Sequence, residues 1–270
     1  MKKAKYLLLL ILFLAGCGGG DSEPEPPTAP ALKDEDFESY VVGDTTVTDF
    51  TEVSTADWTI YEPSFSGKAY QNAISVTSSG SGIAAGQNSS AEIDLPSLAT
   101  SGFKISTSFR INTLTATSLD PSDRASIGLV ARAADDSVAS SSASRYEVRY
   151  ILNDIPVSSS PPAGKLYLSE TNIFSGSGDG LGGAISTGTL AIVLGDIYTL
   201  TLTGTPSGGA LAVSATLTNT TSSSSITVAA TDSADILTGS FFGYLNSVYV
   251  QEGGTTAINV DFDNFSASVP

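Results

Sequence analysis

The sequence predicts a single all-β domain, an antiparallel β-sandwich, from three observations. Short runs of alternating apolar and polar residues recur along the chain, and no useful stretch repeats with the helical period. Gly, Ser, Asn and Asp separate these runs, as they do at hairpin turns. No segment between Phe37 and Ser268 has the composition of an interdomain linker, and about 230 residues is an ordinary length for one sandwich.

The alternation also predicts which side chains of each strand face the core. The expected strands span residues 103–111, 145–152, 165–169, 198–202, 211–217, 240–250 and 257–268. In the second of these, the apolar set is Tyr146, Val148, Tyr150 and Leu152. Glycine and proline pairs, such as Gly208-Gly209, mark the ends of expected hairpins.

The first sixteen residues have the pattern of an export signal. Three lysines precede an apolar run, Leu7 to Leu14, which is too short to span a bilayer as a helix. The run ends in Leu14-Ala15-Gly16-Cys17, which resembles the bacterial lipobox. The resemblance implies that residues 1–16 are a lipoprotein signal peptide and that Cys17 carries the lipid. The alternative is an ordinary signal peptide with an incidental cysteine.

Residues 17–35 are expected to form the lipidated cysteine and a flexible tether rich in glycine, proline and acidic residues. Gly18 stands where lipoproteins of the inner membrane usually carry Asp. By resemblance to that sorting rule, the chain is an exported lipoprotein of the outer membrane of a Gram-negative bacterium, facing the periplasm or the cell surface. The membrane is then a partner only through the acyl chains of the anchor.

Composition excludes several kinds of site. The 270 residues include 12 Lys+Arg, 28 Asp+Glu, no His and one Cys, for a formal charge of −16. Without His there is no Ser-His-Asp triad and no imidazole metal ligand. One Cys allows neither a disulfide nor a cysteine-based zinc site. The acidic balance argues against nucleic acid as a partner, because phosphates need a basic surface.

A series of short motifs resembles one fold family. They are Asp36-Phe37-Glu38-Ser39, Trp58, residues 127–132, 146–150, 166–168 and 239–244, and the closing Val260-Asp-Phe-Asp-Asn-Phe-Ser266. In this order they resemble the bacterial concanavalin A-like jelly rolls of the lectin/glucanase and laminin-G-like superfamily. The resemblance implies a single jelly-roll sandwich over residues 36–270. Because the motifs are short and degenerate, they support the fold far better than a function.

The arginines gather in one part of the sequence. All five lie between Arg110 and Arg149, and alternation puts Arg145, Glu147 and Arg149 on the face opposite the apolar set. Guanidinium groups pair with carboxylates, so a uronate-rich polysaccharide is the expected ligand. The candidate ligand-binding residues are Arg110, Arg132, Arg145, Glu147, Arg149, Tyr249 and Gln251. The alternative is that these residues form cross-strand ion pairs on an exposed sheet face.

An enzymatic interpretation uses the same residues. Arg145-Tyr-Glu147-Val-Arg149 resembles the R-x-E-[LV]-R element of family 7-type alginate lyases, and Tyr249-Val-Gln251 resembles their Y-x-Q. By that resemblance Arg145 and Arg149 neutralise the uronate carboxylate and Tyr249 is the catalytic acid or base. The chain departs from the family in lacking the His of its Q-[IV]-H strand. The E-x-D-x-x-E string of the glucanases is also absent, which argues against hydrolysis.

Two further groups of residues suggest ligands. Carbohydrate-binding modules of this shape often hold a structural Ca²⁺ between an early Glu and a late Asp, and Glu38 and Asp263 are the corresponding pair here. The alternative is a turn or capping role for these acids. Trp58, Tyr61, Phe65 and Tyr70 lie close together in the sequence and are either core residues or a sugar-stacking platform.

The leading functional hypothesis is a lipid-anchored, non-catalytic module that binds carbohydrate. One alternative is a polysaccharide lyase on the same fold, and another is a structural or adhesive envelope lipoprotein without a defined glycan. Burial separates the hypotheses. Binding is favoured if Arg110, Arg145, Arg149 and a tyrosine line one groove. A structural role is favoured if each arginine is capped by a neighbouring acid.

Overall fold

A computed structural model describes residues 31–53, 57–62, 64–65, 67–80, 84–116, 123–134, 144–153, 163–170, 181, 183–233, 236–251 and 253–270. The expected signal peptide, Cys17 and most of the tether lie outside these residues. Within them, no helix is long and apolar enough to cross a membrane.

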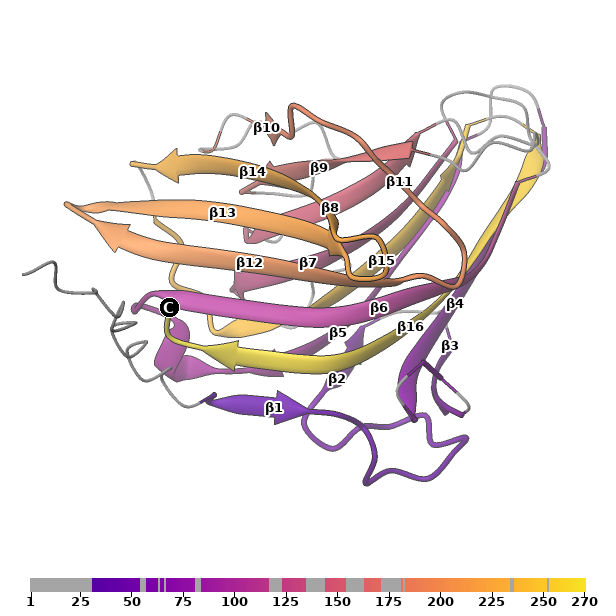
Figure 1. Cartoon of the computed structure of the whole chain (residues 1–270), viewed down its shortest axis with the longest axis horizontal. Coiled ribbons are helices and arrows are strands. Elements are labelled where there is room, and N and C mark those ends of the chain that lie inside the picture. The colour runs from indigo at the N-terminus through magenta and orange to yellow at the C-terminus, as the bar shows by residue number, and fades with distance from the viewer. Residues whose placement is uncertain are drawn as a thin grey trace, which may run out of the picture.

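The described residues form two antiparallel eight-stranded sheets packed face to face, with only one short 3-10 turn, Pro96–Leu98, between strands (Figure 1). Sheet A contains β1 (Lys33–Glu35), β3 (Asp57–Tyr61), β4 (Ala69–Ser78), β6 (Phe103–Ala116), β12 (Ile197–Ser207), β13 (Ala210–Asn219), β14 (Ser224–Asp232) and β16 (Gly254–Ser268). Sheet B contains β2 (Thr51–Val53), β5 (Ala85–Asp94), β7 (Arg124–Ala133), β8 (Tyr146–Asn153), β9 (Ala163–Ser169), β10 (Ala184–Ile185), β11 (Leu190–Ala191) and β15 (Phe241–Val250). The predicted all-β antiparallel sandwich is confirmed.

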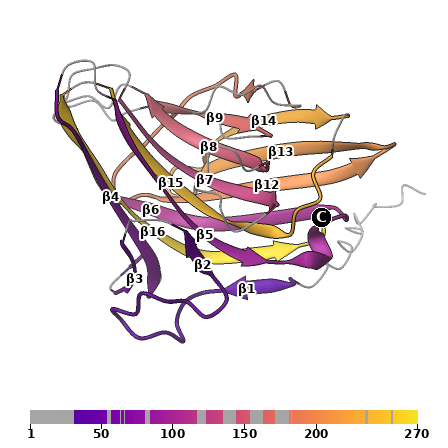
Figure 2. The ribbon, with the colours of Figure 1, turned by 180° about the vertical axis from the view of Figure 1, so that it is seen from behind.

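Strands that are distant in the sequence are neighbours in both sheets. The order in sheet A is β14-β13-β12-β6-β16-β4-β3, and the order in sheet B is β10-β9-β8-β7-β15-β5-β2. Figure 2 shows the molecule from behind, where β5, β15, β7 and β8 of sheet B run side by side. Consecutive strands β6 and β7 therefore belong to different sheets, which separates residues that are close in sequence.

The first and last strands pair with each other. In β1, Glu35 lies opposite Phe265 of β16, and Lys33 lies opposite Ala267. Residues 33–35 were assigned to the tether by composition, yet they complete the edge of sheet A. The folded domain therefore begins by Lys33 rather than at Asp36.

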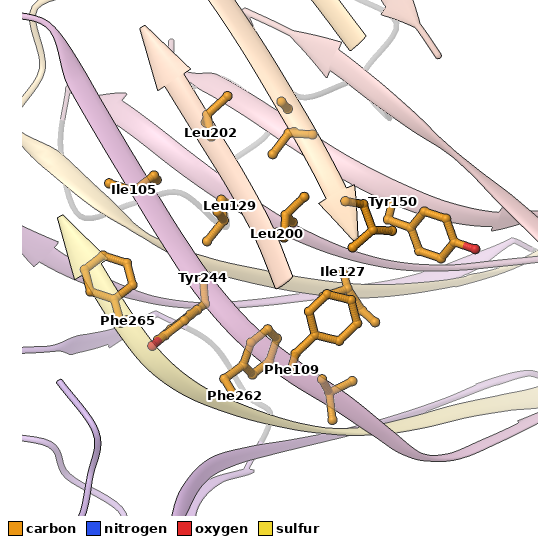
Figure 3. Packing of buried hydrophobic residues seen from close by; sticks show 14 of the residues in the cluster. Ile105, Phe109, Ile127, Leu129, Tyr150, Leu200, Leu202, Tyr244, Phe262 and Phe265 are labelled. Carbon is orange, nitrogen blue, oxygen red and sulfur yellow. The ribbon is translucent and has the colours of Figure 1, made fainter. Parts of the chain in front are cut away.

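The core between the sheets is built from the alternating apolar positions. Tyr146, Val148, Tyr150 and Leu152 of β8 are all buried, as the alternation predicts. Aromatic rings dominate the centre (Figure 3), where the centroids of Tyr244 and Phe262 are 4.8 Å apart. Burial of such rings is the main source of stability for a sandwich of this kind.

The aromatic cluster predicted from the sequence consists of Trp58, Tyr61, Phe65 and Tyr70. Two of its members lie in the core and are not a platform for sugars. Trp58 and Tyr70 are buried, with ring centroids 4.7 Å apart, and the Trp58 indole donates to Ser89 Oγ at 2.6 Å. Tyr61, in contrast, is 38% exposed. The cluster is therefore divided between the interior and the outer surface of sheet A.

Two tyrosines tie the sheets together near opposite edges of sheet A. The Tyr70 hydroxyl of β4 donates to Glu52 of β2, and the Tyr146 hydroxyl of β8 donates to Asp232 of β14. Burial raises the pKa of both phenols, and the adjacent carboxylates raise each pKa further. Both hydroxyls therefore stay protonated at neutral pH and keep donating to their acids.

Candidate functional site on the outer face of sheet B

Arg145, Glu147 and Arg149 lie on the outer face of sheet B, because they alternate with core residues of β8. Arg145 immediately precedes the strand and continues its pairing, since its N–H donates to the carbonyl of Glu170 at 2.9 Å. All three residues are 0% exposed although they point away from the core. Buried charges of this kind are stable only when they are paired.

One carboxylate serves both guanidinium groups. Arg145 Nε donates to Glu147 Oε2 at 3.0 Å, and Arg149 Nε donates to Glu147 Oε1 at 3.1 Å. Burial lowers the pKa of Arg149, and the charge of Glu147 opposes that shift. Two cations and one anion leave this ion triad with a net charge of +1 at neutral pH.

Arg149 also crosses to a neighbouring strand. It lies opposite Gly128 of β7, and its Nη1 donates to Ser247 Oγ of β15 at 3.1 Å. A Cβ at position 128 would collide with the carbonyl oxygen of Val148 and would contact Arg149 Cγ at 3.4 Å. The glycine therefore provides the space in which the arginine side chain lies flat across the sheet.

Tyr249 and Gln251 share this face at one end of β15. Tyr249 follows Ser247 by two residues, so the two side chains are on the same face and about 7 Å apart along the strand. The Tyr249 hydroxyl donates to Gln251 Oε1 at 2.8 Å, and the Gln251 N–H donates to Asp123 Oδ1 at 2.8 Å. The predicted grouping of Tyr249 and Gln251 with Arg149 is therefore retained, with Ser247 between them.

The register reveals further residues on this face that we did not select from the sequence. Three successive rows of residues run across β5, β15, β7, β8 and β9. The first row is Gly86, Tyr249, Arg124 and Asn153, and the second is Asn88, Ser247, Ser126, Ile151 and Lys165. The third row is Ser90, Leu245, Gly128, Arg149 and Tyr167. We call these the basic rows, because they hold the cations Arg124, Arg149 and Lys165 and no Asp or Glu. Arg124 is exposed, and Lys165, Tyr167 and Tyr249 are half-buried. The alternation in Lys165-Leu-Tyr167 is the signal that could have identified two of them.

Arg110 does not join this group, contrary to the sequence prediction. It lies on β6, in sheet A, and its Nη2 donates to Asp261 Oδ2 at 2.9 Å. The chain crosses from one sheet to the other between β6 and β7, so proximity in sequence does not bring Arg110 to sheet B.

Arg132 is also removed from the predicted ligand-binding set. The pairing of β7 with β15 contains a register shift near this residue, whose φ is +55°. Its guanidinium donates to the carbonyls of Leu98 at 3.3 Å and Leu237 at 2.8 Å, and also to that of Ser101. Arg132 is 1% exposed and holds loops together, so it has no surface to offer a ligand.

Glu38 and Asp263, the predicted calcium pair, lie in different environments. Glu38 is exposed and accepts the N–H of Lys68 at 2.8 Å, whereas Asp263 is buried in β16 and accepts from Asn264 Nδ2. No cluster of three or more Asp, Glu, His or Cys side chains suited to a metal ion occurs in the described part of the chain.

The chain is similar to known proteins in its fold and not in its sequence. No family model matches the sequence, and no curated protein matches it significantly. Among solved structures, a marine PL-14 alginate lyase from Aplysia kurodai is similar with a TM-score of 0.51 and 9% identity, over 90% of this chain and 100% of the lyase. The fold is a jelly-roll β-sandwich.

Lectins give weaker similarities to the jelly roll. Lectin I of Ulex europaeus, solved with the methyl glycoside of α-L-fucose, has a TM-score of 0.44 and 13% identity over 84% of this chain and 95% of the lectin. A legume lectin-like domain from Entamoeba histolytica has a TM-score of 0.39 and 10% identity, over 82% and 90% of the two chains. At these identities, the likeness is one of fold.

Proposed function

We propose that this jelly roll binds an anionic polysaccharide on the outer face of sheet B. The observation that carries the proposal is the basic rows: Arg124, Arg149 and Lys165 lie across adjacent strands with no acid among them. The whole chain has a formal charge of −16, so three cations in adjacent rows are a local exception, although the next row on this face holds Glu92 and Glu147. Such a surface attracts an anionic ligand, and the three rows contain no acidic side chain that would repel it.

The exposed and the buried residues of this face have different roles in ligand binding. Arg124 is exposed and Lys165 and Tyr167 are half-buried, so these side chains reach a ligand directly. Carboxylates pair with guanidinium and ammonium groups, and the flat tyrosine ring packs against the apolar face of a sugar. Glu147 caps the buried Arg145 and Arg149, and Asp261 caps Arg110, which is the outcome expected for a structural role of these three arginines. In this proposal the ion triad therefore contributes only its net positive charge beneath the ligand. Uronate-rich polysaccharides combine a carboxylate with sugar rings and therefore fit this arrangement.

Calorimetric titration of the full chain in detergent with an oligouronate tests the proposal. The Arg124→Ser and Lys165→Ser variants are each expected to bind about fivefold more weakly, because each loses one solvent-exposed charge contact of about 1 kcal/mol. The difference should shrink in high salt, since these charges are screened. The matched control is Lys104→Ser, which removes an exposed lysine from β6 in sheet A. If the wild-type chain binds no uronate, or if Lys104→Ser weakens binding equally, the assignment to sheet B is wrong.

Polysaccharide lysis is the second candidate, and the position of Tyr249 favours it. Tyr249 shares a face with Ser247, to which Arg149 donates, so a phenol lies near a cation that could neutralise a uronate carboxylate. Elimination would use the phenolate form of Tyr249, whose oxygen would take the C5 proton. The C5–H electrons would form the C4=C5 double bond as the C4–O bond breaks, and the leaving oxygen would take that proton back from Tyr249. Absorbance of the unsaturated product distinguishes cleavage from binding. Product that is formed by the wild-type chain and lost in Tyr249→Phe would establish the lyase.

We also propose that the jelly roll is held at the outer membrane by a lipid on Cys17, as the lipobox-like Leu14-Ala15-Gly16-Cys17 implies. Residues 17–30 would then connect the lipid to a domain whose first strand begins at Lys33. Mass spectrometry of the amino-terminal peptide tests the modification, with Cys17→Ser as its control.

A further inference from the structure

A second polar site lies on the outer face of sheet A, centred on Asp261. In β16, Asp261 stands between the core residues Val260 and Phe262, so its side chain points away from the interior. Its side chain is nevertheless 0% exposed, whereas that of its partner Arg110 is 21% exposed. A buried carboxylate on an outer sheet face requires several hydrogen-bond donors around it.

Four donors from three segments meet this carboxylate. They are Arg110 Nη2 at 2.9 Å, Asn112 Nδ2 at 2.7 Å, Gln71 Nε2 at 2.8 Å and Ser64 Oγ at 3.1 Å. Asn112 is held further, since it accepts from Arg110 Nε at 2.9 Å and donates to Asn259 Oδ1 at 2.9 Å. These bonds fix the orientation of Asp261 and of the polar side chains that are bonded to it.

Aromatic side chains flank the polar group. The guanidinium carbon of Arg110 lies 5.6 Å from the centroid of the half-buried Phe65 ring, and Tyr61 is 38% exposed at the end of β3. The Ser64 N–H donates to the carbonyl of Gly67 at 2.8 Å, and Phe65 lies between these two residues. Gly67 has φ +127°, a backbone conformation that residues with a Cβ rarely adopt, so this position favours glycine.

We propose that Tyr61, Phe65, Gln71, Arg110 and Asn259 form a second carbohydrate-binding site, specific for an uncharged sugar. Arg110 and Asp261 cancel in charge, so the surface does not select an anion. Gln71 donates to Asp261 through its Nε2, and Asn259 accepts from Asn112 through its Oδ1. The other amide atoms, Gln71 Oε1 and Asn259 Nδ2, are then placed to bond sugar hydroxyls. The aromatic rings provide the surface for the apolar face of a pyranose.

The fixed network favours binding as well as structure. Side chains already held in place lose little conformational entropy when a ligand arrives, so a shallow surface of this kind can bind without reorganising. The site lies on the opposite sheet from the basic rows and has a different ligand class. It goes beyond the proposed function and does not depend on it.

Affinity electrophoresis of the full chain in detergent-containing native gels tests this site, because a chain of charge −16 migrates readily without a ligand. The gels contain a neutral polysaccharide: β-glucan, xylan, mannan or galactomannan. Wild-type chain is expected to be retarded by at least one of them, and Phe65→Ala is expected to weaken that binding at least about fivefold. Phe65 is chosen because its loss spares the four donors to Asp261, and equal melting temperatures will confirm the fold.

Matched variants separate the two sites. Ile185→Ala shortens another exposed apolar side chain, on β10 of sheet B, and should leave the retardation unchanged. The double variant Arg124→Ser/Lys165→Ser should keep its affinity for the neutral polysaccharide, and Phe65→Ala should keep its affinity for the oligouronate. The inference is overturned if none of the four polysaccharides retards the wild-type chain, or if Phe65→Ala binds as tightly as wild type.

Discussion

Replacing Glu147 by Gln is expected to lower the free energy of unfolding by about 3–5 kcal/mol. The substitution keeps the shape of the side chain but removes the only negative charge of the ion triad. Arg145 and Arg149, both fully buried, would then repel each other with no negative charge on the side chain that lies between them. Denaturant unfolding followed by tryptophan fluorescence measures the loss, because Trp58 is the single tryptophan of the chain.

The control for this prediction removes all three charges together. The variant Arg145→Met/Glu147→Leu/Arg149→Met should be within about 2 kcal/mol of wild type, since apolar residues of similar volume often replace a buried ion triad at little cost. It should also bind oligouronates more weakly, because the buried positive charge is gone. A Glu147→Gln variant as stable as wild type would show that the triad is solvated and that its burial has been misjudged.

Truncating Phe262 to Ala is expected to cost about 3–5 kcal/mol of stability, the range for aromatic deletions in a packed core. Its ring lies 4.8 Å from that of Tyr244, 5.7 Å from that of Trp58 and 6.3 Å from that of Phe109, measured between centroids. The rings come from both sheets, so the cavity would weaken the contact that joins them (Figure 3).

The matched control for Phe262→Ala is Tyr61→Ala, in which an aromatic residue of the same sheet is removed from a 38% exposed position. That variant should change stability by less than about 0.5 kcal/mol. Both are measured by chemical denaturation. Comparable losses in the two variants would contradict the division of the aromatic cluster into core and surface members.

The period-two pattern predicted strand faces correctly where strands are regular. It placed Tyr146, Val148 and Tyr150 in the core and Arg145, Glu147 and Arg149 on the other face. It could not indicate that this other face is buried, because burial depends on neighbouring strands that are distant in sequence. The ion triad was thus predicted as a set of residues, but its enclosure was not.

Topology and backbone irregularity explain the residues that were assigned wrongly. Arg110 and Arg132 are close in sequence, but the chain changes sheets between their strands. A positive φ at Arg132 turns its side chain toward loop carbonyls, and no local sequence signal marks that bulge. The pairing of Lys33–Glu35 with β16 was missed for a related reason, since a three-residue edge strand is too short to show alternation.

Chemical-shift mapping of the isotope-labelled full chain with an oligouronate is the most direct test of the central claim that the basic rows bind an anionic glycan. Saturable shifts are expected at the backbone amides of Arg124, Lys165, Tyr167 and Tyr249, and none along β12–β14 of sheet A. No saturable shifts with any uronate, or shifts confined to the surface around Phe65 and Tyr61, would contradict it.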